Sequence, residues 1–236
     1  MSARAGTAFI DAFDSFCRSL NYTPAQVTAN ATLQGKLLAV FERAYKRGYN
    51  KRPWEDAWDG ETVTPVNRLI AFSVIDDARR FEVWDEDPRD PDNSAIELRF
   101  TTTLNGILLM DDATSAFVLS MPKSPLLPKE SWVTGTAYKV GVRVMQDHAV
   151  YRCATAHTAG TFATDLAAVK WVEVTDLEIL EVLEEFTLQF AKGTYQLENG
   201  LEATGGALRS DALTELETLA MTEYCRTANS AWRPKP

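Results

Sequence analysis

Apolar residues recur at helical spacing at both ends of the chain and at strand spacing between them, which limits the folds open to it. Phe9, Phe13 and Phe16 lie on one helical face, and a second helical stripe runs from Leu33 to Tyr45. Helical spacing returns in "LEILEVLEEFTLQFA" and "ALTELETLAMTEYC", with a break expected near "ENG" or "TGG". The chain is therefore predicted to be α+β, with N- and C-terminal helices packing as a bundle around inserted β elements.

The centre of the chain predicts two β segments separated by a linker. Short strands are expected in "SAIELRF", "GILLM" and "SAFVLSM", with turns at "LNG" and "DDAT". "MPKSPLLPKE" holds three prolines in ten residues, which excludes a helix or a central strand. Beyond it, alternating residues predict a hairpin, and "KWVEV" predicts a third strand. The expected organisation is a helical domain at 1–62 and 175–236, a central antiparallel β region at 63–123 and a small three-stranded β module at 131–174.

Local signals predict where helices and turns begin and end. "TPAQ" at 23–26 has the form of a capping box with proline at the first helical position, and "TDLE" at 175–178 predicts a second capping box. Gly48 predicts the end of the second helix. "DH" at 147–148 is expected to form the hairpin turn of the β module, because both residues tolerate positive φ better than most.

Charge limits the partners of the chain. Lys and Arg total 24 and Asp and Glu total 33, which gives a net charge of −9. A general nucleic-acid binder needs a basic surface that displaces counterions, so specific nucleic-acid binding is not expected. The stretch "ERAYKRGYNKR" at 42–52 is the one local exception, a candidate basic patch.

The number of cysteines and the hydropathy of the sequence indicate the cellular compartment in which the protein is expected. The three cysteines are far apart in sequence and suggest no disulfide framework, which favours a reducing environment. The N-terminal "MSARAGTAFIDAF" lacks the apolar core of a signal peptide, and no apolar run approaches the roughly 18 residues of a membrane helix. A cytoplasmic protein without membrane contact is expected.

Cys153 and His157, four residues apart, are the most suggestive chemical pair. His157 could deprotonate Cys153 as a nucleophile, although side chains at 153, 155 and 157 of one strand would stack rather than converge. Together with His148 and Asp165 the pair could bind zinc, but the paired Cys and His knuckles of structural zinc sites are missing. In the third interpretation, which we favour, Cys153 is a small buried residue and His157 bonds a loop carbonyl or threonine. No cofactor or metal is predicted.

The remaining candidates are weaker. The paired acids Asp76-Asp77, Asp111-Asp112 and Glu184-Glu185 could serve hydrolysis, but adjacent carboxylates on turns or helix faces are usually surface charge. The tryptophans Trp54 and Trp58, beside a proline, either anchor a neighbouring subunit or close the core of the chain itself. No assembled catalytic constellation is evident, so an enzyme is not predicted.

The frame "W…AYKVG…V…VYRC…W" runs from Trp132 to Trp171. In this frame, residues 131–174 resemble the small carbohydrate-binding modules of bacterial chitinases. In that family, aromatic residues beside this frame stack on sugar rings, and a pair of tryptophans follows the second strand, where this chain reads "CATAHTAG". The candidate residues for sugar stacking, or alternatively for the module core that their spacing favours, are Trp132, Tyr138, Tyr151 and Trp171.

The variant "YRC…AHTAGTF…W" also resembles β modules of tailed-phage structural proteins. The wider chain is similar to phage head-to-tail connector (neck adaptor) proteins, in the N-terminal helix pair leading into "FERAYKRGYNKRPWEDAW", in "WDEDPRD", in the strands around "LNGILLM" and in the C-terminal helices broken by "LENGLEATGGA". The resemblance implies a structural virion protein of the neck, assembled in the host bacterial cytoplasm. It also implies a ring of about twelve copies joined to the portal protein and to downstream neck or tail proteins.

Two further expectations follow from the connector resemblance. The acidic composition suits a channel whose walls do not bind DNA in transit. The helical parts, 7–50 and 175–228, are expected to form the ring contacts, since their stripes carry more large residues than a thin bundle needs, namely Phe9, Phe13, Phe41, Leu183 and Phe186. The alternative function is that of a carbohydrate-binding phage accessory or receptor-binding protein.

Overall fold

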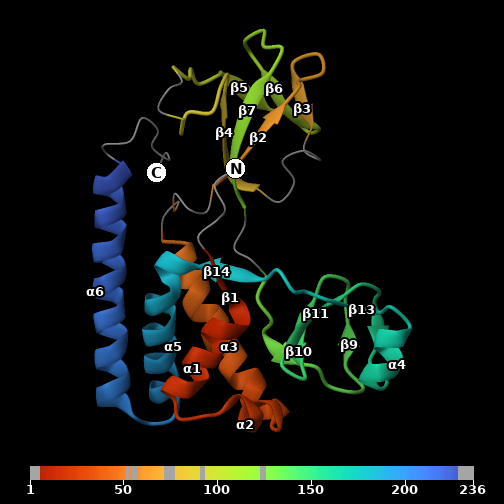
Figure 1. The fold of residues 1–236 in the computed structure, drawn as a ribbon, viewed down its shortest axis with the longest axis vertical. Coiled ribbons are helices and arrows are strands. Elements are labelled where there is room, and N and C mark those ends of the chain that lie inside the picture. Colours follow the sequence, from red (N-terminus) through yellow and green to blue (C-terminus); the bar gives the residue numbers. More distant parts are fainter. Residues whose placement is uncertain are drawn as a thin grey trace. The chain divides into compact units, whose positions relative to one another are not determined.

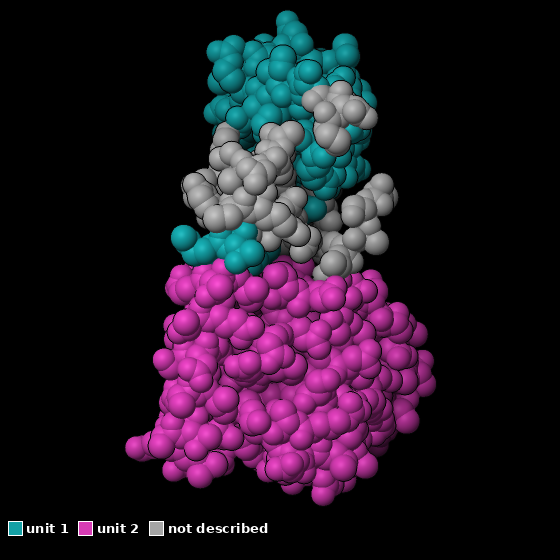
Figure 2. All heavy atoms as spheres, turned by 60° about the vertical axis from the view of Figure 1, so that its left-hand side comes forward, with its two compact units in different colours: residues 1–4, 52–124, 220–236 teal, residues 5–51, 125–219 magenta. Residues whose placement is uncertain are grey.

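The computed structural model confirms an α+β chain with helices, antiparallel strands and one short parallel pair. It describes residues 6–51, 54, 58–71, 78–90, 94–122 and 126–227. The chain divides into two compact units, one of residues 1–4, 52–124 and 220–236 and the other of residues 5–51 and 125–219 (Figure 2). None of the described helices is both long and apolar enough to cross a membrane.

The larger unit is built on helices from both ends of the sequence (Figure 1). The helices are α1 (Phe9–Ser19), α2 (Pro24–Thr28), α3 (Ala31–Tyr49), α5 (Glu184–Glu198) and α6 (Glu202–Thr227). Phe41 of α3 contacts Phe9, Phe13 and Phe16 of α1, with ring centroids 5.6–5.8 Å apart. This aromatic cluster joins the two N-terminal helices into one core.

The large apolar residues of the helical stripes are used inside the chain. Phe9, Phe13, Phe41, Leu183 and Phe186 are each 1% exposed or less. They fill the core between α1, α3 and α5, so they are not available to a neighbouring subunit. The argument that these residues exceed what one bundle needs was therefore wrong, because α1, α3 and α5 of a single chain share them.

The starts of helices α2 and α3 are set by capping residues close in sequence. Thr23 and Gln26 form the predicted capping box, with Pro24 at the first helical position. Asn30 caps α3 by accepting a hydrogen bond from the Leu33 N–H. Helix α3 ends at Tyr49, one residue after the predicted end. The role given to Gly48 as the residue that stops the helix was wrong, because Gly48 lies inside α3, and a Cβ there would lie 2.8 Å from the Phe186 ring.

The second predicted capping box was also wrong. Residues Glu178–Leu180 form strand β14, which pairs antiparallel with β1 (Gly6–Ala8) from the start of the chain. The helix begins only after this pair, through a short 3₁₀ turn at Glu181–Leu183. A partner about 170 residues away in sequence thus overrides the local capping signal.

The α5–α6 connection falls at the "ENG" break, and "TGG" lies inside α6. Gly200 has a φ of 80°, a conformation that glycine adopts without strain, and it reverses the chain so that α6 runs alongside α5 (Figure 1). The two helices cross at Gly193 and Gly205. A Cβ at 205 would lie 2.7 Å from the Gly193 carbonyl oxygen, so the crossing requires glycine.

The described residues of the smaller unit form two three-stranded antiparallel sheets. The first sheet has the order β2-β7-β4 and the second β3-β6-β5. The strands are β2 (Asp59–Val63), β3 (Leu69–Ala71), β4 (Ala78–Trp84), β5 (Phe100–Thr102), β6 (Gly106–Leu109) and β7 (Ala116–Pro122). Strands were correctly predicted in "GILLM" and "SAFVLSM", whereas "SAIELRF" becomes a strand only at Phe100. The β region thus begins at Asp59, ahead of the boundary expected at 63.

The β module is larger than expected. Its main sheet has four strands in the order β13-β11-β10-β8, and a second pair joins β12 and β9. The elements are β8 (Glu130–Ser131), β9 (Ala137–Tyr138), β10 (Arg143–Gln146), β11 (Ala149–Cys153), β12 (His157–Thr158), α4 (Phe162–Ala167) and β13 (Trp171–Glu173). The hairpin turn at Asp147 and His148 has φ values of 48° and 64°, as its residues predicted.

Strand β8 attaches the module to the helices. The Ser131 hydroxyl oxygen lies 3.0 Å from the carbonyl oxygen of Ala31 and 2.6 Å from Oε1 of Gln34, both on α3. Ser131 and Gln34 are buried, so this polar contact is sealed from solvent. Sequence patterning missed β8 because it is two residues long and directly follows the prolines.

Val169 is a strained position of the module. It follows α4 with a φ of 54°, a conformation that is unfavourable for a β-branched residue, and it is 66% exposed. We expect Val169→Gly to raise the free energy of unfolding by about 1 kcal/mol, since left-handed backbone costs about that much for a residue with a Cβ. The same replacement at Val172, in strand β13, should lower it. Chemical denaturation of both variants would test this, and a loss of stability in Val169→Gly would contradict it.

Candidate functional site

Three of the four aromatic candidates of the module, Trp132, Tyr151 and Trp171, contact Phe162 of α4, and the fourth, Tyr138, packs against Trp171. Tyr138 and Trp171 are buried, at 4% and 2% exposed, with ring centroids 5.0 Å apart in an edge-to-face arrangement. Trp132 and Tyr151 are half-buried and contact the Phe162 ring at 5.5 and 4.8 Å. The rings therefore pack against one another as a small core rather than as a flat surface.

This packing bears on sugar binding. Stacking on a sugar needs an open ring face, and the two most central rings have none. We expect the full chain to show no retention on chitin beads under conditions that retain a chitinase binding module. A dissociation constant in the low micromolar range for a chitin oligosaccharide, measured by calorimetry, would refute this expectation.

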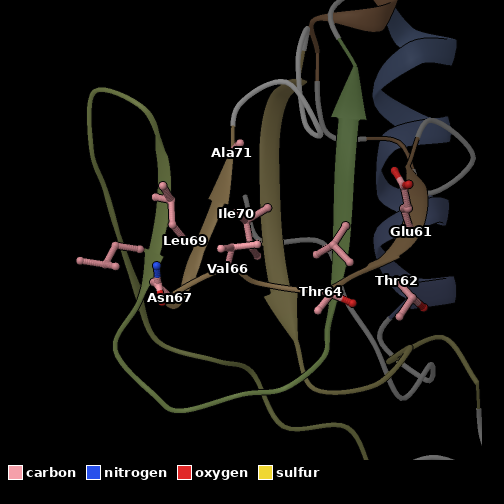
Figure 3. Close-up of a pocket in the computed structure, with 10 residues that line it drawn as sticks. Glu61, Thr62, Thr64, Val66, Asn67, Leu69, Ile70 and Ala71 are labelled. Carbon is pink, nitrogen blue, oxygen red and sulfur yellow. The ribbon is translucent and has the colours of Figure 1, made fainter.

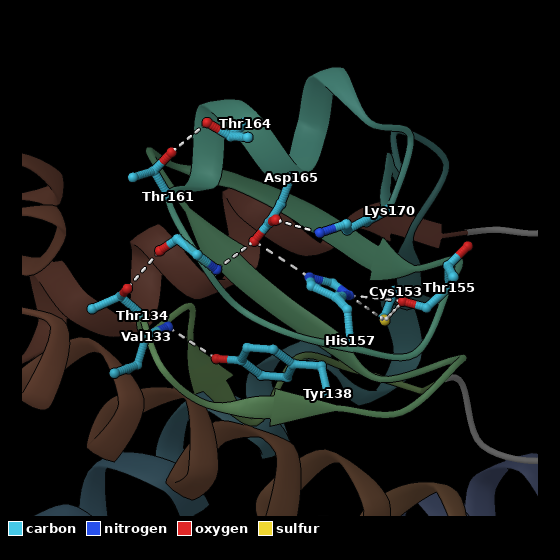
Figure 4. A network of polar contacts seen from close by, with 11 residues as sticks. Val133, Thr134, Tyr138, Cys153, Thr155, His157, Thr161, Thr164, Asp165 and Lys170 are labelled. Atoms are coloured by element: carbon cyan, nitrogen blue, oxygen red, sulfur yellow. Dashed lines mark hydrogen bonds and ion pairs between the residues drawn. The ribbon is translucent and has the colours of Figure 1, made fainter.

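Cys153, His157 and Asp165 come together in space (Figure 4). The Sγ atom of Cys153 lies 3.9 Å from Nδ1 of His157, and Nε2 of His157 lies 3.4 Å from Oδ2 of Asp165. The expectation that residues 153, 155 and 157 lie on one strand, with side chains that stack rather than converge, was wrong. The chain leaves β11 after Cys153, and His157 belongs to β12, which pairs with β9.

The hydrogen bonds of this cluster indicate that it stabilises the module rather than activates a nucleophile. His157 Nδ1 lies 2.7 Å from the carbonyl oxygen of Thr155, and the Cys153 thiol donates to the same oxygen at 3.2 Å. Cys153 is fully buried, and this burial raises the pKa of its thiol. A neutral thiol that is directed at a backbone carbonyl is a poor nucleophile, because the thiolate is the reactive form. The geometry matches the favoured interpretation, in which His157 bonds a loop carbonyl.

Asp165 is the hub of the network. Its side chain is 2% exposed, and it accepts hydrogen bonds of 2.9 Å from both the Gly160 N–H and Nζ of Lys170. It thereby links the first turn of α4 to the preceding loop and to the start of β13. Among the described residues, no group of three or more His, Cys, Asp or Glu side chains is arranged to hold a metal ion. His148, the fourth ligand considered, lies instead 3.4 Å from Asp14 of α1.

The charge of Asp165 makes module stability dependent on pH. Its pKa is lowered because Lys170 and the Gly160 N–H bind the ionised carboxylate. A carboxyl group whose pKa is lower when folded adds stability above its unfolded pKa, and this is lost as pH falls through the folded value. We expect the melting temperature of the wild type to fall below about pH 4. In Asp165→Asn, the part of this fall in melting temperature that comes from Asp165 should be absent. In Asp211→Asn, at an exposed position of α6, the fall should be the same as in the wild type. Identical pH profiles for the two variants would contradict this assignment.

The paired acids do not form a catalytic pair among the described residues. Asp111 is bound to Arg99 at 2.7 Å, and Asp112 lies 3.8 Å from Arg68. Glu184 accepts a hydrogen bond from Thr7, while its neighbour Glu185 accepts one from Gln189. The pair Asp76-Asp77 lies outside the described residues.

An open concavity of about 650 Å³ lies beside strands β2 and β3 of the smaller unit (Figure 3). Its lining is mainly apolar, with Val63, Val66 and Ile70 beside Glu61, Thr64 and Asn67. Among the described residues that line it, Glu61 is the one carboxylate and there is no histidine or cysteine, so they offer no pair of groups for acid–base chemistry. No sequence signal indicated this concavity.

Trp54 and Trp58 are buried, at 1% and 4% exposed. Of their two predicted roles, closing the core of the chain fits this burial, and anchoring a neighbouring subunit does not.

No protein-family model, curated protein or solved structure matches the chain.

Proposed function

We propose that the chain is a structural virion protein, a head-to-tail connector that forms a ring between portal and tail in a tailed bacteriophage. The observation that carries this proposal is the construction of the helical body. Helices α1 and α3 from the start of the sequence share one core with α5 from its end, and α6 packs against α5 where Gly205 meets Gly193. The β module is inserted between α3 and α5 in the sequence. A helical body that carries an inserted β module suits a subunit that repeats around an axis.

The candidate chemical site supports a structural role. The Cys153–His157–Asp165 cluster holds a loop, a helix and two strands of the module together, and its thiol is buried behind them. The aromatic residues of the module fill its interior, which favours the connector over the carbohydrate-binding alternative.

Native mass spectrometry of the purified chain, alone and with the portal protein of the same phage, tests the proposal. We expect a large closed ring, or a complex in which several copies join the portal ring. A small oligomer that does not bind the portal protein but binds chitin or peptidoglycan would refute the connector proposal. It would favour the alternative, a carbohydrate-binding phage protein.

A further inference from the structure

A second cavity, of about 360 Å³, lies between α3, α5 and α6 in the helical unit. Apolar side chains, among them Val40, Ala44 and Leu197, line it together with the buried ring of Phe190. Its charged lining comes from Arg43 and Arg47 of the basic stretch predicted at 42–52, from Glu198 and from Arg209. Three guanidinium groups and one carboxylate thus meet at one apolar cavity.

The charges of this cavity are unbalanced. Glu198 is bound to Arg43 at 2.7 Å. Arg47 and Arg209 instead lie over the Phe190 ring, 5.2 and 4.9 Å from its centroid. Within the described part of the chain, neither of these two arginines forms an ion pair with a carboxylate. The Nε atom of Arg209 is buried and has no hydrogen-bond partner there.

The chain as a whole is acidic, with 33 acidic and 24 basic residues, so two unpaired arginines at one cavity make a local positive site. A ring face holds a guanidinium by its flat side and leaves the N–H groups at its edge free to donate. Two such groups at a cavity with apolar walls match a carboxylate carried on a short apolar stem, because guanidinium binds carboxylate through two parallel hydrogen bonds.

The helix crossing places Arg209 in this position. A Cβ at residue 193 would lie 2.9 Å from Cγ of Arg209 and 2.8 Å from the Gly205 carbonyl oxygen. The absence of a side chain at Gly193 therefore leaves the space that Arg209 crosses to reach Phe190. The cavity is a product of the same close approach that joins α5 to α6.

We propose that this cavity receives a carboxylate side chain from a second copy of the chain. The inference rests on the proposed ring, in which each copy presents one surface to a different surface of its neighbour. Charge complementarity favours a second copy as the source, since a subunit of net charge −9 offers many carboxylates and Arg47 and Arg209 carry uncompensated positive charge.

The test compares Arg47→Gln/Arg209→Gln with the control Lys139→Gln/Arg152→Gln, which removes the same charge from exposed positions of the module. Sedimentation velocity would give the concentration needed for assembly, and circular dichroism would verify that each variant is folded. We expect the cavity variant to need a roughly tenfold or higher concentration, and added salt to weaken wild-type assembly more than that of the variant. Assembly of the folded cavity variant at the wild-type concentration would overturn the inference.

A binding measurement separates this inference from the proposed function. Glutarate, a small dicarboxylate, should raise the melting temperature of the wild type and leave that of the cavity variant unchanged, and inorganic phosphate should act more weakly. If the wild type forms no ring with or without portal, the proposed connector function is refuted. A second copy is then excluded as the occupant of the cavity, regardless of the effect of glutarate on the melting temperature. If rings form but glutarate has no effect and the cavity variant assembles normally, the cavity inference alone fails.

Discussion

Replacing Gly205 by leucine should lower the free energy of unfolding by about 3 kcal/mol and detach α6 from α5. Any side chain at this position meets backbone atoms, because a Cβ would lie 2.7 Å from the Gly193 carbonyl oxygen and 2.8 Å from the Leu197 nitrogen. Backbone of two packed helices cannot move aside without separating them, and such overpacking costs about 1–3 kcal/mol or more. Gly205→Ala should show a smaller loss, since better helix propensity offsets part of the clash.

The neighbouring glycine provides a matched control. A Cβ at Gly206 meets nothing within 4 Å, so Gly206→Ala should raise stability by up to about 1 kcal/mol through helix propensity alone. Urea denaturation followed by circular dichroism would measure all three variants. Equal effects of alanine at 205 and 206 would show that the helices do not approach as closely as described.

The second large effect is expected at the centre of the β module. Trp171→Ala should cost about 3–5 kcal/mol, as truncation of a buried aromatic residue does, and should unfold the module. The Trp171 ring contacts Tyr138 at 5.0 Å, His157 at 5.5 Å and Phe162 at 6.4 Å, so its loss empties the space between the sheet and α4.

Val172→Ala is the control for this variant, because Val172 lies on the same strand but is 39% exposed. Limited proteolysis would report cleavage within 131–174 in Trp171→Ala and not in Val172→Ala. If Trp171→Ala resists proteolysis like the wild type, the aromatic cluster does not hold the module together.

Features set by neighbouring residues could be predicted from the sequence. The capping box at Thr23 and the turn at Asp147 depend on side chains and φ preferences within a few residues. Features set by distant partners could not. The pairing of β14 with β1 removed the capping box expected at Thr175, and Phe186 explains the glycine at position 48, which local rules assign to a helix end.

The candidate site was partly predictable for the same reason. Cysteine and histidine spacing drew attention to Cys153, His157 and Asp165, and these three do come together. Their chemistry depends on Thr155 and Lys170, whose role no motif indicates. The cavity between α3, α5 and α6 could be predicted only in part. The basic stretch at 42–52 contains Arg43 and Arg47, but Arg209 belongs to α6, which is distant in the sequence.

Electron microscopy of phage particles containing this protein tests the connector proposal most directly. The account predicts a ring of copies between the portal and the tail, with the β module of each copy resolved as a separate density beside its helical body. Density for the protein at tail fibres or on the capsid surface, or its absence from purified particles, would contradict the proposed function.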